Sequence, residues 1–278
     1  MNGSPNNRTK NKIADSSLLI AGQRDLVDIV LVSPRNPLNI GAAARAMANF
    51  GFSRLTVAAP WAPHWREAKS AVGAPDLLEQ AKSTESLSEA VAHCTFVVGT
   101  GTLTHRKPEQ PVISLPSLGP LLLRELDRGL ASRIALVFGP EKHGLTRDDL
   151  SYCHALVEIP TDPRQPSMNL GQAVAVCLYE LAVARPSASG APNFAGSNRD
   201  SGDPASSAEL DRLAALVEET MIAADYSPRA MRAANRHDLR LLVRKLSPSA
   251  RETRRILGIF RRILWRLRHS HQPRGPQS

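Results

Sequence analysis

Cysteines are scarce in this chain of 278 residues. The three that occur, Cys94, Cys153 and Cys177, lie far apart in the sequence and form no CxxC pair. This spacing argues against a disulfide scaffold and against a cysteine-based zinc site, so we predict no metal. We interpret all three as buried thiols that pack as small apolar residues.

Long apolar runs are missing from the N-terminal region. Its apolar patch, Leu18–Ala21, is too short for the core of a signal peptide or for a membrane span. We therefore predict a cytoplasmic protein with no membrane partner. The rest of this region is polar, and we expect residues 1–25 to form a disordered extension.

Acidic residues are outnumbered, with 26 Asp and Glu against 35 Lys and Arg, so the formal net charge is +9. Most of the excess lies between Ala208 and Ser278, where 15 Lys and Arg face seven Asp and Glu, a net charge of +8. Such a concentration favours an anionic polymer, such as a nucleic acid, as partner. The alternative is a solvated helix face.

Short β-branched runs alternate with helical patterns through the first two thirds of the chain. This alternation predicts an α/β domain over residues 26–185, with a parallel sheet and helices on both faces. Strands are expected at Asp28–Val32, Leu55–Ala58, Thr95–Val98, Ile134–Phe138 and Leu156–Ile159. Helices are expected at Ile40–Phe50, Pro75–Ala81, Ser86–Ala92, Leu118–Arg128 and Leu170–Ala184.

A second, smaller unit follows a Pro/Gly/Ser/Asn-rich tract. This tract, residues 186–207, has few apolar residues and predicts a flexible linker. Residues 208–270 have helical patterns and predict a basic helical domain, which a disordered tail over residues 271–278 follows. The last helix carries one apolar stripe, formed by Ile256, Phe260, Ile263, Leu264 and Leu267. Arginines crowd this helix, and we predict RNA contacts for four of them: Arg254, Arg255, Arg261 and Arg262.

A motif of small residues follows the first expected strand and runs from Asn39 to Arg45 through isoleucine, glycine and three alanines. Small residues let a helix start close to the sheet and to a ligand. Arg45 falls in the first turns of that helix, where its guanidinium can fork onto phosphate or ribose oxygens. The motif alone is equally compatible with an ordinary surface arginine.

A glycine turn follows the expected strand Ile134–Phe138. Gly139 and Gly144 are spaced as in a phosphate-binding loop, but Leu145 and Thr146 stand where that loop requires Lys followed by Ser or Thr. This argues against a nucleotide triphosphatase, and the missing GxGxxG turn argues against a dinucleotide site. The turn can instead lay its backbone against a flat adenine, or it is a plain strand-to-helix turn.

A proline-rich loop, residues 159–169, leads into the last expected helix of the α/β domain. Ser167 and Asn169 stand where short polar side chains cap a helix by binding its N–H groups. The functional alternative is that these side chains position a hydroxyl group for reaction while the loop holds a cofactor.

Taken together and in this order, the three motifs resemble the signature motifs of the SPOUT superfamily, in its SpoU/TrmH branch of ribose 2′-O-methyltransferases. The resemblance covers roughly Val27–Ala184. It implies a deep trefoil knot in the α/β domain, a rare exception to the rule against knotted chains. It also implies a homodimer in which Arg45 lies near the cofactor of the partner subunit. The implied binding residues for S-adenosyl-L-methionine (SAM) are Thr100, Gly101, Thr102, Gly139, Ile159, Met168 and Asn169.

Within this branch the chain most resembles the TrmJ-type methyltransferases, which modify nucleotide 32 of the tRNA anticodon loop. The opening segment Ile29–Gly41, the segment Ala68–Asp76 and the helical domain after the catalytic one carry this closer match. The resemblance therefore implies a SAM-dependent tRNA ribose 2′-O-methyltransferase acting on cytidine or uridine. The alternatives are an enzyme for ribosomal RNA and a non-catalytic RNA-binding protein.

The resemblance also assigns roles in catalysis. The class makes Arg45 the group that receives the ribose proton, but the pKa of an arginine exceeds 12. An alternative is that Arg45 holds the ribose and its phosphate while another acceptor or water takes the proton. Ser167 and Asn169 would orient the hydroxyl group, and Glu141 would fix either its own loop or Arg45. Beside this site, RNA contacts are expected from two further residues: Arg35 and Asn39.

Overall fold

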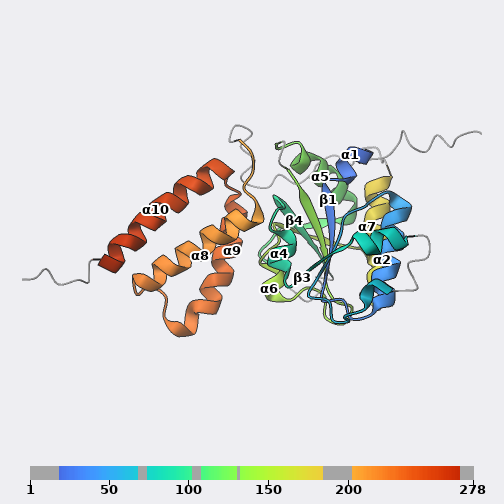
Figure 1. Cartoon of the computed structure of the whole chain (residues 1–278), viewed down its shortest axis with the longest axis horizontal. Coiled ribbons are helices and arrows are strands. Elements are labelled where there is room, and N and C mark those ends of the chain that lie inside the picture. The colour runs from blue at the N-terminus through green and yellow to red at the C-terminus, as the bar shows by residue number, and fades with distance from the viewer. Residues whose placement is uncertain (1–18, 68–73, 102–107, 130–131, 184–201, 270–278) are drawn as a thin grey trace, which may run out of the picture.

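The protein consists of an α/β domain beside a separate group of three long helices (Figure 1). The computed structural model describes residues 19–67, 74–101, 108–129, 132–183 and 202–269. Within these residues the α/β domain and the helical domain follow each other in the predicted order.

A parallel sheet of seven strands forms the centre of the α/β domain, in the order β3-β2-β1-β6-β4-β7-β5. This confirms the predicted parallel sheet. The two edge strands, β3 and β5, were not predicted. Each has only three residues, and among these six residues only Ile113 of β5 is buried. The strands are β1 (Val27–Val32), β2 (Leu55–Ala58), β3 (Lys82–Thr84), β4 (Phe96–Thr100), β5 (Val112–Ser114), β6 (Ile134–Phe138) and β7 (Ala155–Glu158).

Helices cover both faces of this sheet, as Figure 1 shows for α2 and α7 on one side and α4 and α6 on the other. Alternate residues of β1 face opposite sides: Ile29 and Leu31 pack in one core cluster, and Val30 and Val32 pack in a second. The helices are α1 (Ala21–Arg24), α2 (Pro37–Phe50), α3 (Pro75–Gln80), α4 (Leu87–Val91), α5 (Leu118–Leu126), α6 (Arg147–Leu150) and α7 (Leu170–Ala182).

The region predicted to be a disordered N-terminal extension is ordered from residue 19 onward. Leu19 is fully buried, and its N–H donates to the carbonyl of Leu181 over 3.3 Å. The guanidinium Nε of Arg24 donates to the carbonyl of Leu19 over 2.9 Å, and α1 forms between the two residues. The prediction of disorder is therefore wrong for residues 19–25, because one apolar side chain anchors them. Residues 1–18 lie outside the described residues.

The end of the predicted linker is ordered as well. Pro204 pairs with Ser249 in an isolated β-bridge, and the N–H of Ser207 donates to the carbonyl of Cys94 over 2.7 Å. The prediction of a flexible linker is therefore wrong for residues 202–207, since their backbone bonds to both domains. The predicted linker residues 186–201 and the predicted tail residues 271–278 lie outside the described residues.

The helical domain consists of α8 (Ser207–Ala223), α9 (Arg232–Leu246) and α10 (Ala250–His269), which confirms the predicted helical C-terminal region. Its core contains Leu210, Leu213, Val243 and Leu257. Ile263, predicted to lie in the apolar stripe of the last helix, is 41% exposed. No helix among the described residues combines the length and apolar character needed to cross a bilayer.

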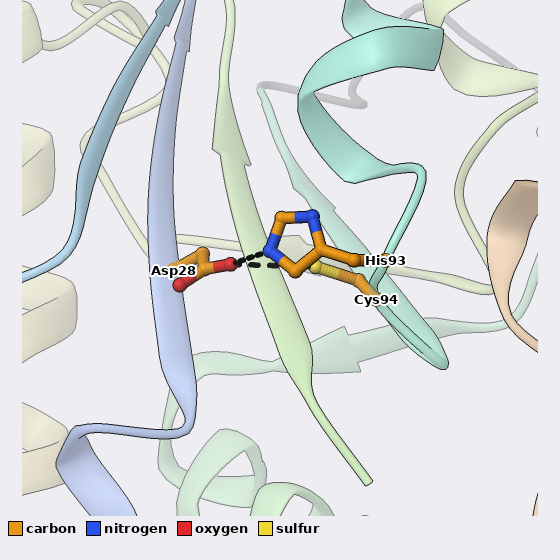
Figure 2. A group of neighbouring side chains, drawn as sticks. All are labelled: Asp28, His93 and Cys94. Atoms are coloured by element: carbon orange, nitrogen blue, oxygen red, sulfur yellow. Dashed lines mark hydrogen bonds and ion pairs between the residues drawn. The ribbon is translucent and has the colours of Figure 1, made fainter. Parts of the chain in front are cut away.

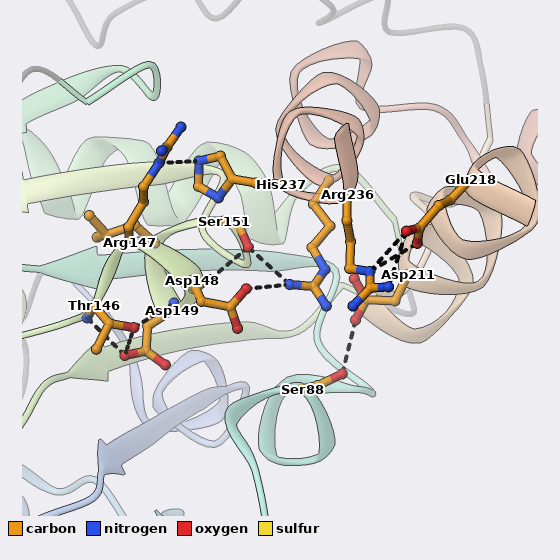
Figure 3. A network of polar contacts seen from close by, with 12 residues as sticks. Ser88, Thr146, Arg147, Asp148, Asp149, Ser151, Asp211, Glu218, Arg236 and His237 are labelled. Atoms are coloured by element: carbon orange, nitrogen blue, oxygen red, sulfur yellow. Dashed lines mark hydrogen bonds and ion pairs between the residues drawn. The ribbon is translucent and has the colours of Figure 1, made fainter. Parts of the chain in front are cut away.

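A network of polar contacts joins the helical domain to the α4 and α6 side of the sheet (Figure 3). The side chain of Arg244 is 1% exposed; it donates to Asp211 over 2.7 Å and to the carbonyl of Tyr152 over 3.0 Å. Arg240 adds an ion pair with Asp148 at 2.7 Å. Because a buried guanidinium needs its partners in fixed places, Arg244 ties the two domains together.

A second charged cluster lies where the central strands begin (Figure 2). Asp28 of β1 is 2% exposed and accepts hydrogen bonds from Arg54 and His93. Arg133 approaches the same carboxylate at 3.4 Å, and the Cys94 thiol approaches it at 3.7 Å. Asp28, His93 and Cys94 are close enough to hold a metal ion. We interpret the cluster as an ion pair, because two guanidinium groups already neutralise the carboxylate.

Asp28 should make the stability of the protein depend on acid pH. Burial alone would raise the pKa of Asp28, but hydrogen bonds from His93 and Arg54 outweigh it and lower the pKa below its usual 3.8. A lowered pKa in the folded state gives stability above about pH 4 and loses it as the pH falls through that pKa. Asp28→Asn should cost about 2–3 kcal/mol at pH 7, measured by urea unfolding.

That cost should shrink steadily as the pH is lowered from 5 to 2, since acid also neutralises the native carboxylate. Asp25→Asn is the matched control, because Asp25 lies in the same region but is exposed. A constant difference between wild type and Asp28→Asn over this pH range would show that the charge of Asp28 is unimportant.

Candidate active site

A pocket opens where the carboxyl ends of β4, β6 and β7 lead into loops. Ligands in open α/β sheets bind at this edge. Five of the predicted SAM-binding residues line it: Thr100, Gly101, Gly139, Ile159 and Met168. Thr102 lies outside the described residues, and Asn169 stands next to the lining residues Met168 and Leu170. The remaining lining residues are Phe138, Pro140, Glu141, Lys142, His143, Gly144, Leu145, Thr161, Pro166, Ser167, Leu170 and Ala173.

Gly139 lets the loop after β6 fold back on itself. A Cβ atom added at Gly139 would lie 2.3 Å from the backbone of both Gly144 and Leu145. Gly144 has a φ of +62°, in the left-handed region that favours glycine. The two glycines therefore have different functions, since one permits a close approach and the other permits the turn.

Asn169 caps α7, which confirms the helix-capping interpretation for this residue. Its side-chain oxygen accepts hydrogen bonds from the N–H groups of Gly171 at 2.9 Å and Gln172 at 3.4 Å. Ser167 makes no such contact among the described residues; it is exposed and lines the pocket. Gly171 lets α7 approach α2, since a Cβ there would lie 2.6 Å from that of Ala42.

A chain of hydrogen bonds links all three motifs at the edge of the pocket. The side-chain amide of Asn169 donates to Asn39 over 2.9 Å, and that of Asn39 donates to Glu141 over 2.8 Å. The two carboxylate oxygens of Glu141 also accept from the N–H groups of Arg35 at 3.1 Å and Asn36 at 3.2 Å. Of the two functions considered for Glu141, the structure therefore shows the fixing of a loop, since these contacts join its own loop to the start of α2.

Glu141 is ionised at neutral pH in this arrangement. Partial burial would raise the pKa of Glu141, but hydrogen bonds from Asn39 and from backbone N–H groups outweigh it and lower the pKa. A carboxylate that accepts from charged or polarised donors forms stronger hydrogen bonds than a neutral acceptor. The network is thus anchored by one negative charge, and it holds the amide of Asn39 in a fixed position.

Arg45 lies outside this network. It is exposed on α2, does not line the pocket, and forms no hydrogen bond or ion pair with a described residue. The structure thus brings Glu141, Ser167 and Asn169 together at one pocket and leaves Arg45 apart from them. The predicted RNA-binding arginines are all exposed: Arg35, Arg254, Arg255, Arg261 and Arg262.

Several pocket residues were missed by sequence reasoning. Lys142 and His143 stand inside the glycine turn, where the motif itself was the available signal. Leu170 and Ala173 belong to the apolar face of α7, and an apolar residue facing a ligand has the same sequence pattern as one facing the core.

Comparison with known proteins decides what kind of site this is. The model of the SpoU rRNA methylase family matches residues 27–179, more than half of the chain. The chain belongs to the SpoU rRNA methylase family. The membership confirms the resemblance derived from the three motifs, because all of them lie inside the matched region.

The similarity to relatives of the TrmJ type extends beyond the α/β domain of this SpoU family member. TrmJ of Pseudomonas aeruginosa, a tRNA (cytidine/uridine/adenosine-2′-O-)-methyltransferase, is 36% identical over 203 residues, which are 71% of this chain and 78% of the relative. TrmJ of Pectobacterium atrosepticum is 32% identical over 250 residues, 89% of this chain and 98% of its own. The crystal structure of TrmJ from Z. mobilis ZM4 has a TM-score of 0.72 and 29% identity; the match covers 85% of this chain and 98% of that one.

A SpoU methylase uses SAM as methyl donor, which confirms the predicted cofactor and the predicted class of enzyme. The pocket fits such a group. A Cβ added at Gly101 would meet nothing within 4 Å, so the backbone there borders open space. Ile159 and Met168 are half-buried and give an apolar wall, which suits the flat rings of an adenosyl group.

Proposed function

We propose that this protein transfers a methyl group from SAM to the ribose 2′-hydroxyl of nucleotide 32 in the anticodon loop of tRNA, in the cytoplasm. The observation that carries the proposal is the similarity to TrmJ proteins over both domains, including 98% of the Z. mobilis chain. Cytidine and uridine are the proposed bases, since the name of the P. atrosepticum relative gives both. The basic helical domain supplies contacts to the RNA backbone.

The chemistry of the proposed reaction requires alignment of two groups. Bound SAM supplies an electrophilic methyl group, and a ribose hydroxyl is a weak nucleophile at neutral pH. The exposed hydroxyl group of Ser167 orients the ribose at the pocket wall, while the network from Glu141 to Asn169 holds the loops in place. Arg45 binds the ribose and its phosphate, and the hydroxyl proton passes to water or to another acceptor, because a guanidinium that is already protonated cannot take it.

We further propose that the protein acts as a homodimer in which Arg45 reaches the pocket of the partner subunit. The exposed position of Arg45, away from the pocket of its own chain, supports this arrangement. The proposed trefoil knot is supported by the chain order: β4 lies between β6 and β7, and α7 returns to pack on α2. A crystallographic trace of the dimer would test both statements.

A direct test compares nucleosides of tRNA by mass spectrometry. A strain that lacks this gene should lose a 2′-O-methylated nucleotide at position 32, and the purified protein with SAM should restore it. Ribosomal RNA is the second candidate substrate, favoured by the description of the family. Loss of a methyl group from ribosomal RNA, with tRNA unchanged, would select that alternative. Absence of SAM binding in a calorimetric titration would leave a non-catalytic RNA-binding protein.

Methyl transfer should not depend on a metal ion. Among the described residues, two groups of side chains could hold a metal, one at Asp28 and one at Glu109, His237 and Asp238, and neither lines the pocket. Treatment with EDTA should therefore leave the rate of methylation unchanged within about twofold, whereas a catalytic metal supplies several kcal/mol. Loss of activity that added Mg²⁺ or Zn²⁺ restores, with an unchanged circular dichroism spectrum, would contradict this expectation.

A further inference from the structure

An exposed tryptophan stands beside the first motif and has no function in the site described so far. Trp61 is 70% exposed, in the loop that follows β2. The backbone N–H of Trp61 donates to the carbonyl of Pro34 over 3.4 Å, which holds this part of the loop against the segment between β1 and α2. A tryptophan ring exposed to this extent presents a large π face that a ligand can cover.

The guanidinium group of Arg35 lies over the ring of Trp61, 4.9 Å from its centre. The N–H of the same residue donates to Glu141, which lines the pocket. Arg35 therefore contacts both the ring of Trp61, through its side chain, and the pocket residue Glu141, through its backbone. The ring presents a π surface and a positive charge together, which are the two contacts that unpaired RNA bases and their phosphates use.

The backbone on both sides of this pair is held in an unfavourable conformation. Ser33, directly after β1, has a φ of +45°, and Ala59, directly after β2, has a φ of +47°. Neither residue is a glycine, so this conformation is sterically unfavourable for both, and the surrounding structure must stabilise it. The two turns direct the segments that carry Arg35 and Trp61 toward each other.

We propose that Trp61, with Arg35 upon it, is a stacking platform for an unpaired base of the RNA next to the methylated nucleotide. The inference rests on the proposed function, since it takes the anticodon loop as the ligand. Sequence-specific recognition of RNA relies on bases that are splayed out of loops and stacked on aromatic rings or guanidinium planes. The platform positions the loop so that the target ribose enters the pocket, and it takes no part in the chemistry.

The test uses the full-length protein, SAM and an unmodified tRNA transcript. Trp61→Leu keeps an apolar side chain but removes the aromatic ring, and Trp61→Phe keeps a ring. The Leu variant should raise KM for tRNA roughly ten- to a hundredfold, the strength of one stacked base, with kcat and SAM affinity unchanged. The Phe variant should recover most of the loss. A 2-aminopurine base beside the target nucleotide should change its fluorescence on binding to the wild type and not to the Leu variant.

Three results would overturn the platform. One is a Leu variant with the KM of the wild type. Another is a Phe variant that is as impaired as the Leu variant, which would indicate a packing role for tryptophan alone. The third is a Leu variant that becomes monomeric in sedimentation, which would make Trp61 a subunit contact. Wild-type protein that fails to methylate any tRNA would instead reject the proposed function, so the two failures can be told apart.

Discussion

Arg45→Ala should lower the turnover of tRNA methylation by about 10²- to 10³-fold while the affinity for SAM stays unchanged. Removal of one preorganised donor from a reacting centre has an effect of this size. Arg45 is exposed and forms no hydrogen bond or ion pair with a described residue, so its substitution should not disturb the fold. Steady-state kinetics and a calorimetric SAM titration give the two readouts. Arg45→Lys keeps the charge but loses the planar fork, and it should recover only a small part of the activity.

Asn169→Ala should also be inactive, because it breaks the network that holds the pocket loops, and mixing it with Arg45→Ala would show which subunit supplies the arginine. If Arg45 acts on the partner's pocket, a dimer of one Arg45→Ala chain and one Asn169→Ala chain has one intact site. An equal mixture of the two should then reach about a quarter of wild-type activity after subunit exchange, because half of the dimers are mixed. No recovery in a mixture with proven exchange would place Arg45 at the pocket of its own chain. An Arg45→Ala enzyme with near-normal turnover would contradict the assignment altogether.

Replacing four arginines of α10 should weaken tRNA binding on the order of a thousandfold at 0.1 M salt. The helix carries seven arginines and one acidic residue, and all seven arginines are exposed. Each phosphate that an arginine neutralises releases counterions, so the slope of log K against log salt should fall by roughly 3 to 4. The four substitutions to glutamine are made in the full-length chain: Arg254, Arg255, Arg261 and Arg262. Filter binding across a salt series measures both values.

The matched control replaces the same four arginines by lysine, which keeps the charge at each position. If backbone phosphates are the ligands, the lysine variant should keep most of the affinity and the salt slope. The catalytic pocket is untouched in both variants, so SAM binding should stay the same. Unchanged tRNA affinity and slope in the glutamine variant would show that α10 is a solvated helix face, the alternative that composition alone allowed.

The sequence was most informative where residue type is dictated by backbone geometry. Gly139 and Asn169 were found as a turn and a cap, and both have those roles in the structure. The central strands were found because burial on both faces leaves continuous apolar runs. The edge strands β3 and β5 were not found, because three mostly exposed residues give no recognisable hydrophobic pattern.

Contacts between distant segments could not be predicted from local patterns. The hydrogen bonds of Glu141 span more than 100 residues, and nothing near Glu141 in the sequence distinguishes the loop-fixing function from contact with Arg45. Leu19 belongs to a short apolar patch in an otherwise polar region, and only the fold shows that it lies against Leu181. Trp61 and Trp65 stand four residues apart, and only the fold shows that Trp65 is buried while Trp61 is exposed.

The buried contact of Arg244 has a consequence for how the enzyme selects its target. With Arg244 at 1% exposure holding Asp211 and the backbone of Tyr152, the arginines of α10 and the pocket keep a fixed separation. If α10 binds the stem of the tRNA as proposed, the pocket receives the nucleotide that lies one fixed distance away from that stem. A flexible hinge in place of this contact would let neighbouring nucleotides compete for the pocket. The choice of nucleotide would therefore depend on the rigid connection between the domains rather than on recognition of the base.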